Sequence, residues 1–312
     1  MPGTPGRRLM GSLRRFVPWC LLLLVALGAG LGLGLGLAGS PSQVQNAGAT
    51  SERTYYVSLG DSYAVGYQPG PGPTLHGYAN FVARDARALG HDFTLENFGC
   101  AGATTASILN QVGCIVPAIG GAPYAGRTQL GAAEQFIADH HGRIGLITVS
   151  IGGNDVTACA VASSPLTCIG AAVSTIETNV ARVASGLRSA AGPDVPIIGL
   201  TYPDVILGKW VYPPVSQSLA ELSVVAFRNL LNPALQRTYA SAQASLVDVT
   251  AATGAYVPLT RTVSASPYGT IPYAVDQVCK LTYFCSQGNI HADTAGYELI
   301  GRLIVTQLSH SR

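Results

Sequence analysis

Short apolar runs alternate with longer segments of helical periodicity from residue 54 onward. Runs rich in β-branched and other apolar residues predict strands over residues 55–59, 93–98, 144–151, 195–201 and 245–249. Apolar residues at helical spacing predict helices over residues 78–89, 129–140, 171–190, 216–241 and 294–308, the last capped by Asp293. Residues 144–151 are almost continuously apolar, as expected for a central parallel strand buried on both faces. The alternation predicts βαβ units on a mostly parallel sheet.

The N-terminal region follows a different pattern. Four arginines precede an uncharged stretch over residues 16–51, within which residues 19–38 are almost wholly apolar or glycine. A basic segment followed by an apolar one is typical of an export signal, and this apolar run is long enough to span a bilayer. The small residues at 47–49 offer a cleavage site. We therefore expect a signal peptide or N-terminal membrane anchor over 1–49, a linker over 50–53 and one folded domain over 54–312.

Charge adds little to this picture beyond excluding one class of partner. Charged residues make up 11% of the 312 residues and hydrophobic residues 48%. Without the four N-terminal arginines the formal net charge changes from +2 to about −2. No basic patch with interleaved aromatic residues remains, so nucleic-acid binding is not expected. Membrane association is expected only through residues 19–38.

Six cysteines lie outside the apolar run, and the spacing favours pairing between neighbours. The expected disulfides are Cys100–Cys114, Cys159–Cys168 and Cys279–Cys285. Disulfides persist in oxidising compartments, so this interpretation agrees with export. No Cys-x-x-Cys sequence occurs, and no metal is expected.

Three polar motifs lie at the ends of predicted elements. Ser62, in Gly60-Asp61-Ser62-Tyr63, directly follows the first strand, where open α/β sheets bind their ligands. Asn154 follows the third strand, and His291 stands just before the last helix. A serine in this position is a candidate nucleophile, which requires a base and donors for an oxyanion. Histidine has an ordinary pKa of about 6.5, so His291 is the candidate base.

Together with Gly102, these residues resemble the four sequence blocks of the SGNH (GDSL-type) hydrolase family. The blocks carry serine, glycine, asparagine and histidine in that order, and the resemblance runs from about residue 54 to about residue 308. It implies a three-layer α/β/α, flavodoxin-like fold with a mostly parallel sheet of about five strands. It also implies that Ser62 and His291 are catalytic. The implied oxyanion hole consists of the Ser62 N–H, the Gly102 N–H and the Asn154 side-chain amide.

Together with the expected export signal, the resemblance predicts a secreted or surface-anchored protein, expected to be a monomer, whose residues 54–312 form the catalytic domain. This domain would hydrolyse carboxylic esters through an acyl-Ser62 intermediate, without a cofactor or metal. Acyl transfer to a sugar hydroxyl and a catalytically weak cell-surface binding module are the alternatives. The family acts on lipids, acetylated sugars and small esters, so the substrate stays open. The apolar segments 205–214 and 255–275 could form an acyl-binding wall or pack on the core.

The sequence departs from the family pattern at the third member of the triad. The family's aspartate stands three residues before the histidine, where this chain has Gly288. Some family members complete a Ser-His dyad with a main-chain carbonyl, so the Gly288 carbonyl is the expected acceptor for His291 Nδ1–H. A more distant carboxylate, Asp276 or Asp204, is the alternative.

Overall fold

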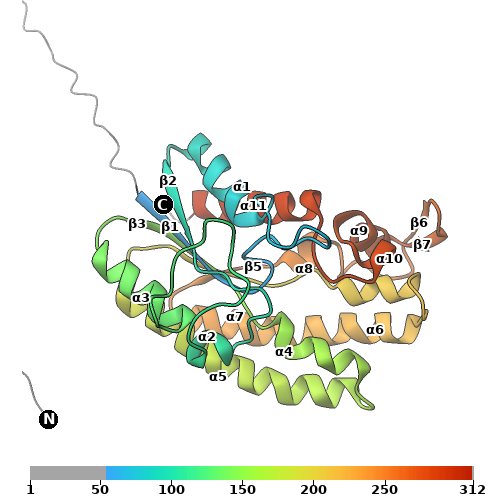
Figure 1. The fold of residues 1–312 in the computed structure, drawn as a ribbon. Coiled ribbons are helices and arrows are strands. Elements are labelled where there is room, and N and C mark those ends of the chain that lie inside the picture. The colour runs from blue at the N-terminus through green and yellow to red at the C-terminus, as the bar shows by residue number, and fades with distance from the viewer. Residues whose placement is uncertain (1–53, 311–312) are drawn as a thin grey trace, which may run out of the picture. The chain divides into compact units, whose positions relative to one another are not determined.

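The computed structural model describes residues 54–310, in which a central sheet lies between two groups of helices (Figure 1). All five strands of the sheet are parallel, in the order β2-β1-β3-β4-β5. The strands are β1 (Thr54–Gly60), β2 (Phe93–Asn97), β3 (Ile144–Ser150), β4 (Ile197–Leu200) and β5 (Ser245–Val247). This is the flavodoxin-like strand order, so the predicted fold class is confirmed.

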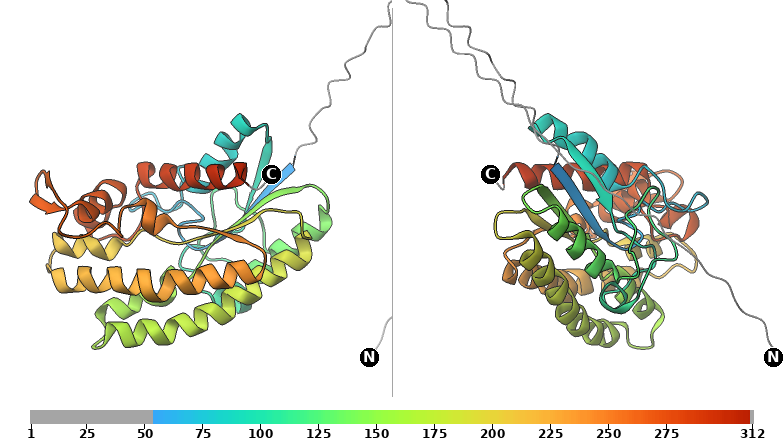
Figure 2. Two further views of the ribbon diagram at one scale, coloured as in Figure 1. Left: turned by 180° about the vertical axis from the view of Figure 1, so that it is seen from behind. Right: turned by 60° about the vertical axis from the view of Figure 1, so that its left-hand side comes forward.

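The helices form one layer on each face of the sheet (Figures 1 and 2). One layer contains α1 (Tyr78–Asp85) and α11 (Thr294–Ser309), and the other contains α3 (Gln129–Asp139), α5 (Pro165–Ala191) and α7 (Asn232–Ser241). Successive residues of a strand point to opposite faces. In β1, Val57 and Leu59 accordingly belong to the core beneath α3, α5 and α7, whereas Tyr56 belongs to the core beneath α1 and α11.

A third, smaller apolar core lies beside the sheet, around Leu207, Val275 and Phe284. It is built by the 3₁₀ segment Val205–Trp210, α6 (Gln217–Ala226), α9 (Tyr273–Leu281), α10 (Phe284–Gln287) and the antiparallel hairpin of β6 (Thr262–Ala265) and β7 (Gly269–Pro272). The remaining short elements are α2 (Ser107–Asn110), α4 (Gly153–Thr157), α8 (Val249–Ala252) and the 3₁₀ turns Ala86–Leu89 and Ala158–Val161.

Two predicted helices differ from the observed ones for local reasons. The helix expected over 171–190 begins earlier, at Pro165, because proline suits a first helical turn, whose N–H groups have no intrahelical acceptor. The helix expected over 216–241 is divided by a π-helical turn, Phe227–Leu231, just before Pro233. The hairpin within 255–275 was not predicted, because its four-residue strands are too short to show a clear alternation.

The three expected disulfides are present, joining Cys100 to Cys114, Cys159 to Cys168 and Cys279 to Cys285. The predicted leader and linker lie outside the described residues. Within residues 54–310, no helix is both long enough and apolar enough to cross a membrane.

Candidate active site

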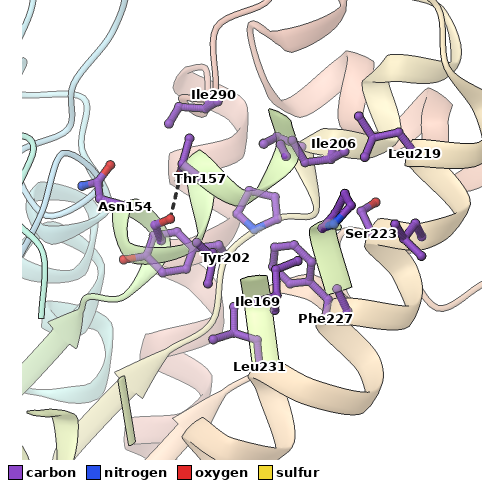
Figure 3. Close-up of a pocket in the computed structure, with 18 of the residues that line it drawn as sticks. Asn154, Thr157, Ile169, Tyr202, Ile206, Leu219, Ser223, Phe227, Leu231 and Ile290 are labelled. Carbon is purple, nitrogen blue, oxygen red and sulfur yellow. Dashed lines mark hydrogen bonds between the residues drawn. The ribbon is translucent and has the colours of Figure 1, made fainter. Parts of the chain in front are cut away.

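The ends of the neighbouring strands β1 and β3 bring Ser62 and Asn154 to one cavity. The sheet order reverses direction here, and open α/β sheets bind ligands at such points. The cavity is open to solvent, and the empty space within it and at its mouth is about 900 Å³. Ser62 is 6% exposed and lines this cavity together with Ile290, the residue before His291. Figure 3 shows the Asn154 side chain at the same end of the cavity as Ile290.

Asp61 supports the serine from a fully buried position. One of its carboxylate oxygens accepts a 2.9 Å hydrogen bond from the Tyr63 N–H, and the other accepts a 2.6 Å bond from the Tyr202 hydroxyl. Burial raises the pKa of Asp61 from 3.8 to about 7, although these two hydrogen bonds oppose the shift. Both oxygens are occupied, so the carboxylate braces the loop around Ser62.

The second and third sequence blocks are joined by hydrogen bonds. Asn154 Nδ2 donates a 2.8 Å bond to the Ala103 carbonyl, which leaves its second amide hydrogen for another acceptor. Asp155 accepts from the Thr105 N–H at 3.0 Å and from its hydroxyl at 2.5 Å. These contacts hold the loop that carries Gly102 against the end of β3.

Gly102 itself is exposed and has a φ of +84°, a conformation that residues with a Cβ rarely adopt. It lines a second cavity, together with Ala103, and is not among the residues that line the cavity of Ser62. Among residues 54–310, neither the Gly102 N–H nor the Ser62 N–H has an intramolecular acceptor. Both groups are therefore able to donate to a ligand.

His291 is held by main-chain pairing and by the side chain of Asn289. Its carbonyl accepts a 3.0 Å bond from the Tyr283 N–H. The oxygen Oδ1 of Asn289 lies 3.1 Å from the His291 backbone nitrogen and 2.7 Å from ring atom Nδ1. The backbone N–H can only donate, so the amide must present its oxygen here, and Nδ1 must carry the proton. The lone pair of the ring is consequently on Nε2.

The expected role of Gly288 is therefore corrected, because the acceptor at His291 Nδ1 is Asn289 Oδ1. Gly288 ends α10 with a φ of +65°, and a Cβ built on it would lie 2.6 Å from the ring of Tyr212. An aspartate in the family's usual position would thus be both strained and obstructed. The two carboxylates considered as alternative partners of His291 have other partners. Asp276 pairs with Lys280 at 2.7 Å, and Asp204 accepts a 2.8 Å bond from Ser223.

The ring of His291 packs against Tyr67, with 4.5 Å between ring centroids. Burial lowers the pKa of His291 from 6.5 to about 4, so the ring is neutral at pH 7. No hydrogen bond joins the side chains of Ser62 and His291 in the described structure, and such bonds commonly tighten only when substrate binds.

Three residues of the site were not predicted as such. Tyr63 joins the serine loop to the histidine loop, and Tyr202, at the end of β4, reaches Asp61. Asn289 was overlooked even though asparagine often hydrogen-bonds the backbone two residues ahead, a signal that was available in Asn289-Ile290-His291. No group of three or more histidine, cysteine, aspartate or glutamate side chains within residues 54–310 is arranged to hold a metal ion.

Comparison with known proteins places these residues in context. Residues 58–299 match the model of the GDSL-like Lipase/Acylhydrolase family. An extracellular lipase from Streptomyces rimosus is 20% identical, with a TM-score of 0.49 over 81% of this chain and 98% of that one. Phospholipase A1 from Streptomyces albidoflavus NA297 is 18% identical, with a TM-score of 0.47 over 82% and 98%. No curated protein matches the chain. The family match alone carries the functional argument.

Proposed function

The chain belongs to the GDSL-like lipase/acylhydrolase family, and from this premise we propose that it hydrolyses carboxylic esters through an acyl-Ser62 intermediate. The observation that carries the proposal is that Ser62 and Asn154 line one cavity at the ends of adjacent strands. The loop that carries His291 reaches the same cavity through Ile290. In this proposal Ser62 is the nucleophile, Asn154 an oxyanion donor and His291 the base, which are the groups that acyl transfer requires.

In the first half of the reaction, Ser62 Oγ attacks the ester carbonyl carbon while His291 Nε2 takes the serine proton. The carbonyl becomes an oxyanion, to which the Ser62 N–H, the Gly102 N–H and the free Asn154 amide hydrogen donate. The bond to the alcohol oxygen then breaks, and the histidine returns its proton to the departing alcohol. Asn289 Oδ1 keeps the Nδ1 proton in place, so Nε2 is the atom that exchanges protons in both steps.

In the second half, water replaces the alcohol. His291 Nε2 takes a proton from water as the water oxygen attacks the acyl carbon. The bond between Ser62 Oγ and the acyl carbon breaks, the serine regains its proton from the histidine, and a carboxylic acid leaves. The cavity is open at its mouth, so water can reach the acyl carbon, which supports hydrolysis over transfer to a second alcohol.

The proposal also includes the compartment. We propose that residues 1–49 export the domain, either as a cleaved signal peptide or as a retained anchor. Three disulfides within residues 54–310 support an oxidising environment.

Replacement of the nucleophile tests the proposed reaction. Ser62→Ala should lower turnover of p-nitrophenyl esters by about 10³-fold or more. A serine-directed fluorophosphonate should label the wild type and a Ser174→Ala control, whose substitution lies on the exposed side of α5, but not Ser62→Ala. Labelling that survives in Ser62→Ala would exclude Ser62 as the nucleophile.

A further inference from the structure

The cavity of Ser62 has a polar end and an apolar end. Ser62 and Asn154 stand at the polar end. From there the cavity extends between the first turns of α5, the 3₁₀ segment Val205–Trp210 and α6, toward Ile169, Leu219, Phe227 and Leu231 (Figure 3). An extended ligand whose carbonyl lies at Ser62 would therefore direct the rest of its acyl group along apolar side chains.

The polar groups of the apolar end already have partners. The Ser223 hydroxyl donates to the buried carboxylate of Asp204 at 2.8 Å and also contacts the Ala220 carbonyl at 2.8 Å. The Thr157 hydroxyl donates to the Gly153 carbonyl at 2.8 Å. Asp61 is the only acidic or basic residue among the described residues that line the cavity. A sugar hydroxyl placed deep in the cavity would lose its water without gaining a partner, which is costly.

The far end of the cavity is shaped by the π-helical turn between α6 and α7. The Asn232 N–H donates to the carbonyl of Phe227, five residues earlier, which defines the wider turn. Pro233 follows. It has no N–H to continue a regular helix, and its ring displaces the carbonyl of the preceding turn. Phe227 and Leu231, the first and last residues of the turn, both line the cavity. Such turns are uncommon and occur often at functional sites.

We propose that this cavity binds the acyl chain of a medium- or long-chain carboxylic ester, with the chain running from Ser62 to the turn at Phe227–Leu231. The inference rests on the proposed function and selects, among ester classes, lipid-like acyl groups over acetylated sugars and small esters. The apolar lining continues past Ser62 to Ile169, Phe227 and Leu231, so it offers contacts that an acetyl group bound at Ser62 would not use. Segment 205–214 contributes Val205 and Ile206 to the wall, whereas the described lining includes no residue of 255–275.

The first test measures kcat/KM for p-nitrophenyl esters from acetyl to palmitoyl. Each methylene that enters the cavity should raise kcat/KM by up to about fourfold, so octanoyl, with six more methylenes than acetyl, should exceed it by at least about 10²-fold and by up to about 4 × 10³-fold. A profile that is flat or falls from acetyl onward would overturn the proposal while leaving ester hydrolysis intact.

Variants of the cavity wall should move the preferred length in opposite directions. Ala226→Leu adds bulk inside the cavity and should lower the dodecanoyl-to-acetyl ratio of kcat/KM by about tenfold or more. Phe227→Ala opens the far end and should raise the palmitoyl-to-octanoyl ratio. Ile169→Phe, on the separate helix α5, repeats the narrowing if Ala226→Leu does not fold. Val225→Leu is the matched control, because Val225 is 42% exposed on the same helix and should leave the ratios unchanged.

A binding measurement separates failure of the cavity from failure of the reaction. Calorimetry with Ser62→Ala should show octanamide binding at least about tenfold more tightly than butanamide, and addition of Ala226→Leu should remove the difference. Length-dependent binding without any esterase activity would support the acyl cavity and overturn the proposed reaction. Equal affinity for the two amides would overturn the acyl cavity, whatever the activity.

Discussion

The hydroxyl of Tyr63 donates a 2.7 Å hydrogen bond to the carbonyl oxygen of Ile290. Tyr63 directly follows the proposed nucleophile, and Ile290 directly precedes the proposed base, so this bond joins their two loops. Tyr63 is 5% exposed, and its ring packs against Tyr202 and Tyr297. The bond is partly buried, so its loss would leave the Ile290 carbonyl without its donor at a partly desolvated position.

Tyr63→Phe should therefore lower kcat/KM by about tenfold, which corresponds to a loss of about 1.4 kcal/mol of transition-state stabilisation because the two loops are less well aligned. The ring is retained, so the circular dichroism spectrum should stay that of the wild type. Tyr55→Phe, in β1, is the matched control and should keep full activity. Equal activity in all three proteins would show that the bond does not align the site.

The acidic limb of the pH–rate profile should lie at an unusually low pH. Burial lowers the pKa of His291 from 6.5 to about 4, and the ring must be neutral to accept the serine proton. The kcat/KM for a short p-nitrophenyl ester should therefore hold from pH 7 down to about pH 5 and fall near pH 4. A midpoint at about 6.5 would mean that the histidine is solvated in the free enzyme.

Asn289 should determine the pH at which the acidic limb of the profile has its midpoint. Asn289→Asp replaces the amide oxygen at Nδ1 with a charged one, which favours the imidazolium and should raise the His291 pKa and the acidic midpoint together. Asn289→Ala removes the acceptor and should lower kcat by about 10- to 100-fold, less than the loss when a triad aspartate becomes asparagine. Asn110→Asp, on the exposed end of α2, should change neither quantity. A purely structural role for Asn289 would leave the midpoint unmoved in Asn289→Asp.

Asp61 should make the fold less stable as the pH rises toward neutrality. Its pKa is 3.8 in an unfolded chain and about 7 in the native protein, so between these values only the native state holds the proton. The native state is then favoured most at low pH, and on the order of 4 kcal/mol is lost by pH 7. Asp61→Asn, read by urea unfolding at pH 4.5 and pH 7, should show a smaller decline than the wild type. Asp92→Asn, at a 48% exposed side chain, is the control and should decline as the wild type does.

The disulfides predict the thiol content of the protein. Seven cysteines are present, and six of them are paired, so the unreduced, denatured chain should show no thiol beyond that of Cys20. After reduction, all seven should react. Free thiols at the six paired positions in protein recovered from an oxidising compartment would contradict the pairing and weaken the inference of export.

Much of the fold could be predicted because its signals are local. An almost continuous apolar run at 144–151 needs burial on both faces, and the observed β3 lies at the centre of the sheet. The alternation of strands and helices then predicted a parallel sheet, in which the carboxyl ends of all strands lie at one edge. Ser62 and Asn154 each follow such an end, so their convergence did not depend on distant packing.

The acceptor for His291 could not be chosen from sequence, because the choice depends on the direction of one ring and on a distant side chain. Tyr212 occupies the space beside Gly288, and nothing near residue 288 in the chain reveals it. The extent of the acyl cavity was equally hidden. It depends on a π-helical turn before Pro233 and on the packing of α5 against it. A sequence pattern records which residues avoid water, but only the tertiary structure decides which of them line a cavity and which fill the core.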